Sequence, residues 1–265
     1  MLESLIKTNN VYLNHKMLNS WYEKLDLPVA PACNMMCNFC TKSSSCICNG
    51  NNPEYLSRSM TPRQAVNWAL ASAKRNRRIR ILKISGPGEP LFNNQTFEVL
   101  KRLNVEMPEH IYSINTNGIL LEEKAHLLAG LNVKMVEVSM NAFYSETVRK
   151  LYSRVINDKG FFSTAVMADE MIKSQINGIK LSKELGIDVR LNIIYFPGIN
   201  DEDIGIIASK CREWKIKSIT LISCCPNGKM AGLRAPSIEE LSILQHKLSL
   251  LVDEVEIKSF AHQIN

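Results

Sequence analysis

The sequence predicts an α/β protein whose core is a partial, TIM-like barrel of six strand–helix units. Short runs rich in β-branched residues alternate with helix-like stretches, and several runs are apolar almost throughout, as is typical of parallel strands covered on both faces. The chain has 265 residues, 45% of them hydrophobic, enough for one sizeable core. A doubly wound sheet would share this alternation, and we favour the barrel over it.

The expected elements follow one another without a clear linker. Strands are expected at residues 27–30, 79–84, 111–114, 135–140, 189–195 and 218–222. Helices are expected at residues 61–74, 95–103, 122–131, 165–185, 202–214 and 237–251. Thr61 before Pro62 is typical of a helix start, and Ser237 with Glu240 has the spacing of a capping box. We therefore expect a core barrel at residues 27–236, after an N-terminal extension (1–26) and before a C-terminal helix and tail (237–265).

Composition excludes several classes of protein. No apolar run approaches the length of a bilayer span, and the first residues are too polar for a signal-peptide core, so we expect a soluble, cytoplasmic protein without a membrane partner. The net charge of +6 is concentrated only at residues 74–80, where no aromatics accompany the basic residues, so no nucleic-acid partner is expected. Eight cysteines without an export signal indicate metal ligands or buried thiols rather than disulfides.

The densest group of cysteines directly follows the first expected strand. Cys33, Cys37 and Cys40 have the spacing CxxxCxxC. Three thiolates from one loop can bind three irons of a [4Fe-4S] cluster and leave the fourth iron without a protein ligand. A structural zinc site needs four closed ligands, which Cys46 or Cys48 would have to complete, and this remains the alternative.

Glycines and polar residues lie on or just after the other expected strands. They are Gly86, Gly88, Glu89, Asn117, Ser139, Asn141 and Asn192. Chemistry in such barrels collects at the carboxyl ends of the strands, so these residues are candidate ligand contacts. The glycines would let the backbone approach a ligand closely, and the carboxylate of Glu89 can accept hydrogen bonds from an ammonium group. Asn200 and Asp201 are expected to cap the helix that they precede.

The cysteine motif, with Phe39 before its last cysteine, resembles that of the radical S-adenosylmethionine (SAM) superfamily. The resemblance implies a [4Fe-4S] cluster whose open iron binds SAM, reductive cleavage of SAM to methionine and a 5'-deoxyadenosyl radical, and an electron donor of the flavodoxin or ferredoxin type. It places Phe39 against the adenine or the cluster, and the segment from Gly86 to Glu89 at the SAM amino group. Ser139 and Asn192 would contact the ribose or carboxylate.

Five further segments, at residues 27–34, 86–90, 141–142, 197–201 and 231–237, resemble the NifB family. Members of that family fuse two [4Fe-4S] units into a larger core and insert a carbon from a SAM methyl group. The resemblance therefore implies a role in nitrogenase cofactor assembly, with iron–sulfur cluster donor proteins as further partners. A divergent radical SAM enzyme acting on another substrate and a non-catalytic iron–sulfur carrier or scaffold are the competing hypotheses.

The chain departs from the NifB pattern in its cysteines. The family has a cysteine in an N-terminal His-Pro-Cys segment, one on the third strand, and a C-terminal Cys-x-x-Cys. This chain has Ser113 on that strand, no cysteine before Cys33 and none after Cys225. Cys46 matches a family cluster ligand, whereas Cys48, Cys224 and Cys225 match none, and these four are candidate ligands of an auxiliary cluster. The alternative for Cys224 and Cys225 is that they are idle thiols, since adjacent side chains on an extended chain point apart.

Overall fold

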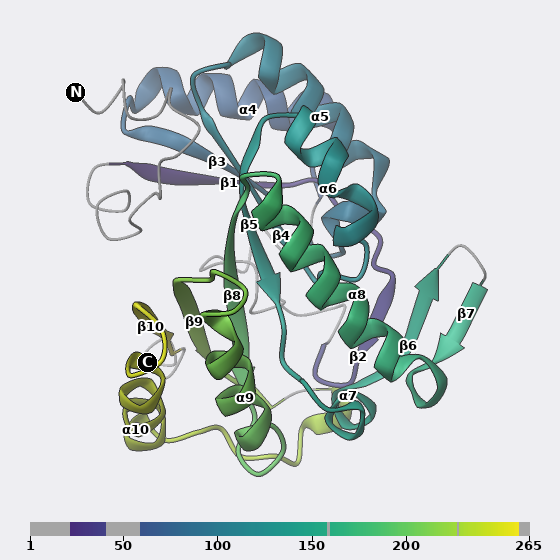
Figure 1. Ribbon diagram of the computed structural model, residues 1–265. Coiled ribbons are helices and arrows are strands. Elements are labelled where there is room, and N and C mark those ends of the chain that lie inside the picture. The colour runs from purple at the N-terminus through teal and green to yellow at the C-terminus, as the bar shows by residue number, and fades with distance from the viewer. Residues whose placement is uncertain (1–21, 41–58, 158–159, 227, 260–265) are drawn as a thin grey trace.

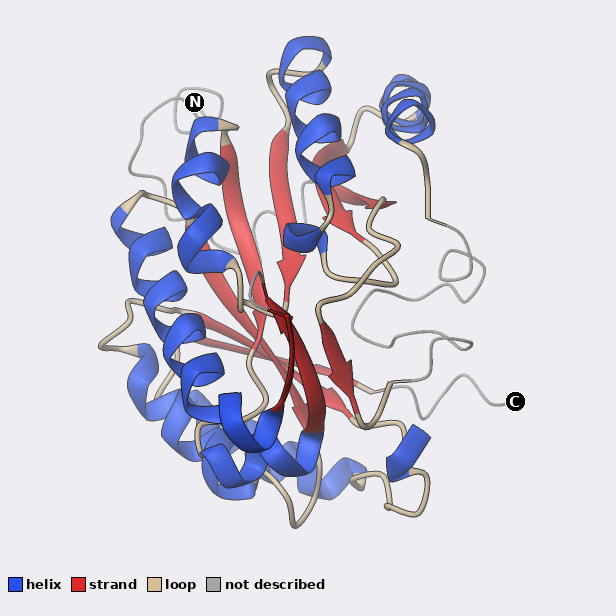
Figure 2. Ribbon diagram, turned by 90° about the vertical axis from the view of Figure 1, so that its right-hand side faces the viewer, coloured by secondary structure: helices blue, strands red, loops and turns tan. Residues whose placement is uncertain are grey.

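A curled, fully parallel sheet forms the centre of the protein, and helices line its outer side (Figures 1 and 2). The computed structural model describes residues 22–40, 59–157, 160–226 and 228–259. The sheet has seven strands in the order β1-β3-β4-β5-β8-β9-β10, and every neighbouring pair is parallel. This arrangement confirms the expected partial barrel. No helix of the described ranges is long and apolar enough to span a bilayer.

All six expected strands are present, and a seventh joins them. The sheet contains β1 (Glu23–Pro28), β3 (Ile79–Ser85), β4 (Ile111–Thr116), β5 (Val133–Ser139), β8 (Asp188–Tyr195), β9 (Ser218–Ser223) and β10 (Glu254–Lys258). The first strand begins four residues earlier than expected, at Glu23, and ends at Pro28. Strand β10 was expected to be part of the C-terminal tail. Its charged and apolar residues alternate as in a half-exposed strand, and its pairing with β9 identifies it as one.

The helices also follow the expected order. They are α4 (Pro62–Arg75), α5 (Asn94–Glu106), α6 (Leu121–Gly130), α7 (Ser145–Leu151), α8 (Thr164–Glu184), α9 (Asp201–Cys211) and α10 (Ile238–Ser249). Both predicted starts are confirmed, since Thr61 and Ser237 each form a complete capping box. Helix α7 was not expected. Its entry is fixed by the buried Asp203, which accepts hydrogen bonds from the backbone N–H groups of Phe143 and Tyr144 and from the Thr147 hydroxyl.

A small antiparallel sheet, also unexpected, lies beside the barrel (Figure 1). It consists of β2 (Met35–Cys37), β6 (Tyr152–Asn157) and β7 (Gly160–Ser163). Strand β2 lies inside the cysteine motif, and its partner β6 follows α7, more than one hundred residues along the chain. A three-residue strand has no periodicity to detect, so only the tertiary structure reveals it.

The two faces of the large sheet differ in chemistry. Outward-facing side chains such as Leu82, Ile114 and Leu191 are buried in one continuous apolar core with the helices. Inward-facing positions alternate with these and include Lys83 and Glu137, which are also buried. The apolar core therefore holds the helices to the sheet, and the polar groups are left on the concave face.

Candidate functional site

The cysteine loop is held in place by the small antiparallel sheet. Cys37 lies opposite Tyr152 in the β2–β6 pair. On either side, the Ile156 N–H donates to the Asn34 carbonyl (2.7 Å) and the Asn38 N–H donates to the Leu151 carbonyl (2.8 Å). These backbone bonds fix the course of the loop between Cys33 and Cys40 without using its side chains.

The loop after β3 fixes the approach to the same cysteines. The N–H groups of Gly88 and Glu89 donate to the carbonyls of Ala30 and Ala32, each at 2.8 Å. The Asn93 side chain also bonds both polar backbone atoms of Ala32. A Cβ atom on Gly88 would lie 2.0 Å from the Ala32 carbonyl oxygen, and one on Gly86 would lie 2.5 Å from that of Ala30. The glycines thus let one backbone segment pack against another, a role that the sequence analysis did not assign to them.

We expect Gly88→Ala to lower the free energy of unfolding by about 3 kcal/mol, because the added methyl group forces apart two hydrogen-bonded backbone segments. The measurement is chemical denaturation of the cluster-free protein. Gly205→Ala is the matched control: Gly205 lies in α9 with nothing within 4 Å of the added Cβ, so this variant should be more stable than wild type by about 1 kcal/mol. Equal stabilities for the two variants would contradict the close packing at Gly88.

Glu89 is the most constrained of the predicted ligand contacts. Its carboxylate accepts hydrogen bonds from the Leu91 N–H (3.0 Å), the Thr116 hydroxyl (2.7 Å) and the Asn117 N–H (2.6 Å). Burial raises the pKa of Glu89 to about 7, and these three hydrogen bonds lower it only in part. The carboxyl group therefore links the loop after β3 to the end of β4, and it titrates near neutral pH.

The remaining predicted contacts lie on or just after the neighbouring strands β5 and β8. Ser139 and Asn192 are partners in the β5–β8 register. The Asn141 amide oxygen accepts from the Ile194 N–H (2.8 Å), and its nitrogen donates to the Tyr152 hydroxyl (2.9 Å). Both polar atoms of Asn141 are thus used within the protein, which connects β5, β8 and the small sheet. Its contact with SAM stays a prediction, as do those of Ser139, Asn117 and Asn192.

Phe39 lies in an aromatic cluster at this edge of the barrel. Its ring centroid is 4.9 Å from that of Phe196 and 5.8 Å from that of Tyr152. The phenyl ring is only partly buried, so one side of it remains available to a ligand.

Of the two expected helix caps, Asn200 and Asp201, neither bonds the α9 backbone as a side-chain cap. Asn200 is at the N-cap position, but its amide instead bonds the Phe196 N–H and the carbonyls of Asn141 and Ile194. Asp201 accepts from the Tyr195 hydroxyl and the Gly198 N–H. The capping prediction was therefore wrong. The side chains of Asn200 and Asp201 instead form hydrogen bonds that hold the turn before α9 in place.

A buried ion pair lies deeper on the concave face. The Lys83 ammonium is 3.1 Å from a Glu137 carboxylate oxygen, and Lys24 lies 3.9 Å from the other oxygen. Asn192 donates to the same carboxylate at 3.3 Å. Burial alone would raise the pKa of Glu137, but the positive charges of Lys83, Lys24 and Lys258 outweigh it and lower the pKa to about 2. Glu137 is thus an anion at all ordinary pH values and positions Asn192.

The chain segment that follows the late cysteines contacts the cysteine loop through its backbone. Cys224 and Cys225 follow β9; Cys224 is buried, which raises its pKa to about 11, whereas Cys225 is exposed. Four residues after Cys225, the Lys229 N–H donates to the Asn38 carbonyl (2.8 Å). Cys46 and Cys48 lie outside the described residues. Cys211 is buried in α9, as expected of a core thiol, and burial raises its pKa to about 12.

The thiols fit an iron–sulfur cluster better than a single metal ion. Within residues 22–40, 59–157, 160–226 and 228–259, no three His, Cys, Asp or Glu side chains converge as they would around one ion. A cluster spreads its thiolates over different irons, so it does not require such convergence. A second observation points the same way. Asn34, which follows Cys33, is fully buried, and its side-chain nitrogen has no acceptor among the described residues.

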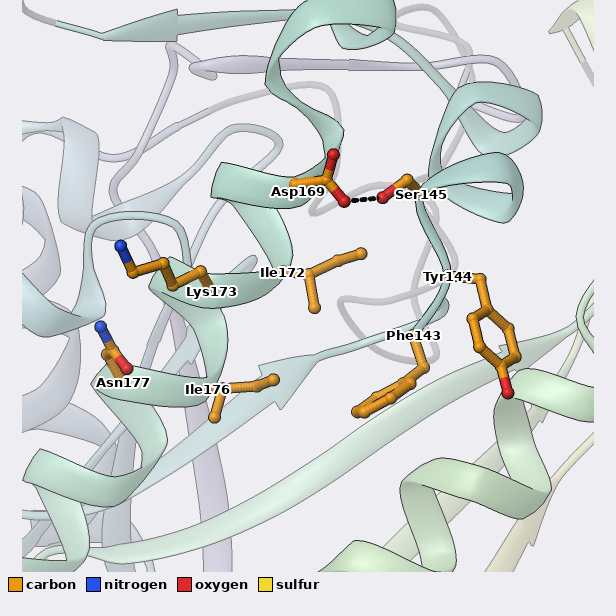
Figure 3. Close-up of a pocket in the computed structure, with 8 residues that line it drawn as sticks. All are labelled: Phe143, Tyr144, Ser145, Asp169, Ile172, Lys173, Ile176 and Asn177. Carbon is orange, nitrogen blue, oxygen red and sulfur yellow. Dashed lines mark hydrogen bonds between the residues drawn. The ribbon is translucent and has the colours of Figure 1, made fainter.

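A cavity of about 330 Å³ lies apart from these residues, between α7 and α8 (Figure 3). Its lining residues are Phe143, Tyr144, Ser145, Asp169, Ile172, Lys173, Ile176 and Asn177. In the close-up, Phe143, Ile172 and Ile176 form its apolar wall, and the Ser145 hydroxyl donates to Asp169 at one side. None of the predicted site residues lines it, so we do not assign the site to this cavity.

Comparison with known proteins matches the barrel and the cysteine loop to one superfamily. The family model described as the radical SAM superfamily matches residues 27–211. The "FeMo cofactor biosynthesis protein NifB" of Methanocaldococcus infernus is 32% identical over 244 residues, which are 91% of this chain and 80% of that protein. The chain belongs to the NifB family of radical SAM enzymes. The protein of the same name from Methanocaldococcus jannaschii is 33% identical over 82% of this chain and 72% of its own length.

Other NifB proteins are matched over less of their length; in that of Chlorobaculum tepidum, 46% is covered at 31% identity. Among solved structures, a radical SAM methyltransferase from Sphaerobacter thermophilus has a TM-score of 0.65 at 20% identity, covering 90% of this chain and 66% of that one. Streptococcus suis SuiB bound to S-adenosylmethionine has a TM-score of 0.63 at 18% identity, covering 92% of this chain and 52% of that one. These likenesses confirm the fold. As a radical SAM enzyme, this NifB-family chain uses a [4Fe-4S] cluster and SAM.

The sequence analysis missed three residues that organise the site. Asn34 and Asn93 bond across to other loops, and Gln175 on α8 donates to the carbonyls of Asn117 and Ser139. Asn34 was visible inside the cysteine motif, and its position next to Cys33 was the available signal. Asn93 and Gln175 had none, because their roles depend on long-range contacts.

Proposed function

We propose that this chain acts in FeMo cofactor biosynthesis, as a radical SAM enzyme whose Cys33, Cys37 and Cys40 bind the [4Fe-4S] cluster. The observation that supports this most directly is the cysteine loop, which is fixed at the carboxyl ends of the strands by β6 and by the loop after β3. The chain also matches a NifB protein over four fifths of that protein's length. Such a loop presents three thiolates from one side and leaves one iron open.

The bound cluster supplies one electron for the reductive cleavage of SAM. The protein's own residues bind and orient the two partners. Glu89 offers a buried anionic acceptor beside Asn117 for the SAM amino group, and Gly86 and Gly88 position it. Ser139 ends β5, Asn141 follows it, and Asn192 lies beside Ser139 within β8, where ribose or carboxylate groups would contact them. Phe39 offers a partly exposed ring, and the walls of the barrel exclude water.

We include an auxiliary cluster in the proposal, with Cys46, Cys48, Cys224 and Cys225 as its candidate ligands. Exposed Cys225 is the better placed of the last two, because the backbone after it contacts the cysteine loop, while Cys224 is buried with a raised pKa. The reductant would be a flavodoxin- or ferredoxin-type carrier, and substrate clusters would come from iron–sulfur donor proteins. Thiolate ligands favour a reducing compartment such as the cytoplasm.

A second candidate function is a radical SAM reaction on a different substrate. Ser113, where the family has a cysteine, is buried on β4, and its hydroxyl has no hydrogen-bond partner among the described residues. A serine hydroxyl is a poorer ligand for iron–sulfur clusters than a thiolate. A different arrangement of substrate clusters, or a different substrate, would follow from this change.

The deciding experiment is anaerobic. The chain is reconstituted with iron and sulfide, its iron is counted, and dithionite and SAM labelled in the methyl group are added. Deoxyadenosine formation, with label retained in the protein-bound iron–sulfur fraction, would support cofactor assembly. Deoxyadenosine without retained label, from a protein with about four irons, would favour the second candidate. No SAM cleavage by the loaded protein would reject both and favour a cluster carrier.

A further inference from the structure

One buried donor in the cysteine loop has no acceptor among the residues that the structure describes. Asn34 lies between Cys33 and Cys37 and is completely buried. Its amide oxygen accepts from the Asn117 side chain at 2.7 Å and its backbone carbonyl accepts from the Ile156 N–H, but its side-chain nitrogen donates to none of the described residues. Leaving a buried N–H group unpaired costs about 1–3 kcal/mol, so such groups are rare.

The orientation of this amide is fixed by its neighbours. Asn117 accepts the Ile119 N–H with its own side-chain oxygen (3.1 Å), so its nitrogen must face Asn34. Asn34 must in turn present its oxygen to that nitrogen. An exchange of oxygen and nitrogen in either amide would bring together two donors or two acceptors. The unpaired N–H of Asn34 is therefore directed away from Asn117 by a network anchored in backbone atoms.

We propose that the Asn34 side chain donates a hydrogen bond to a sulfur atom of the cluster bound by Cys33, Cys37 and Cys40. This inference rests on the proposed cluster site. The donor belongs to the loop that must surround the cluster, and thiolate and sulfide sulfurs are acceptors. Hydrogen bonds to cluster sulfurs stabilise the reduced, more negative state and raise the reduction potential. Asn34 is thus a positioning residue that makes the cluster easier to reduce.

The test compares wild type with Asn34→Leu, which is similar in size and lacks the donor. Both proteins are reconstituted, and the cluster potential is measured by EPR-monitored redox titration without SAM. We expect Asn34→Leu to have a more negative potential, with at least a tenfold lower equilibrium constant for reduction, which is about 59 mV for one electron. An unchanged potential would overturn the inference. An effect on SAM affinity alone would also overturn it, because the acceptor would then be SAM.

A measurement on the wild-type protein covers the case in which Asn34→Leu fails to hold a cluster. Asparagine labelled with ¹⁵N in its side-chain amide is incorporated, and the reduced cluster is examined by ENDOR. A ¹⁵N coupling together with a proton coupling that disappears in D₂O would support the hydrogen bond, and the absence of both would refute it. If the wild-type chain takes up no cluster at all, the proposed function itself fails, which distinguishes the two results.

Discussion

Cys37→Ala is expected to abolish SAM cleavage. Cys37 is the central thiol of the motif and lies in β2, where its backbone is fixed opposite Tyr152, so neither Cys33 nor Cys40 can take its position. Without it the loop offers the cluster two ligands instead of three, and we expect the cluster to be lost. After anaerobic reconstitution, we expect iron to fall by about four atoms per chain and 5'-deoxyadenosine formation to fall to the level of a reaction without protein.

Cys211→Ala is the matched control for this prediction. Cys211 is buried in α9, and its thiol donates to the Ile207 carbonyl. Its loss removes packing and one weak hydrogen bond within α9 and should cost about 1 kcal/mol of stability. Iron content and SAM cleavage should match wild type. Equal iron and equal activity in Cys37→Ala and wild type would show that the cluster is bound elsewhere.

The stability of the cluster-free protein should fall as pH rises from about 4.5 to 7, because of Glu89. Burial raises the pKa of this carboxyl group from 4.5 to about 7 in the folded protein, so the folded state binds a proton more tightly than the unfolded state. The resulting stabilisation is complete below pH 4.5, is lost progressively up to pH 7 and stays lost above it. The difference between the two pKa values corresponds to about 3 kcal/mol.

Glu89→Gln isolates this effect, since glutamine does not titrate. Urea unfolding of both cluster-free proteins is measured between pH 4.5 and 8. The free energy of unfolding of wild type should exceed that of the variant most at pH 4.5, and this difference should shrink by about 3 kcal/mol at pH 8. Burial lowers the pKa of His110, but His110 is present in both proteins and cancels, and Glu137 remains ionised throughout. Two parallel curves would mean that Glu89 titrates normally.

The sequence predicted most of the large sheet but little of what holds the cysteine loop. Strands such as β3 and β8 are long, buried runs, and their composition alone identifies them. Strand β10 was missed although its residues alternate between charged and apolar, whereas the small sheet of β2, β6 and β7 was missed because its strands are short and form through long-range pairing. The placement of Glu89 and Asn117 at strand ends was predicted, whereas their contact with each other was not.

By itself the sequence determined the chemistry of this protein. The spacing of Cys33, Cys37 and Cys40 is a local property, because three thiols within eight residues must share one loop wherever the chain places it. The tertiary structure decided how that loop is held and which groups face it. Gly88 packs on Ala32, Asn117 orients Asn34, and β6 pairs with β2 through contacts between residues 56 to 120 positions apart. Such contacts depend on the path of the whole chain, which no local pattern of residues specifies.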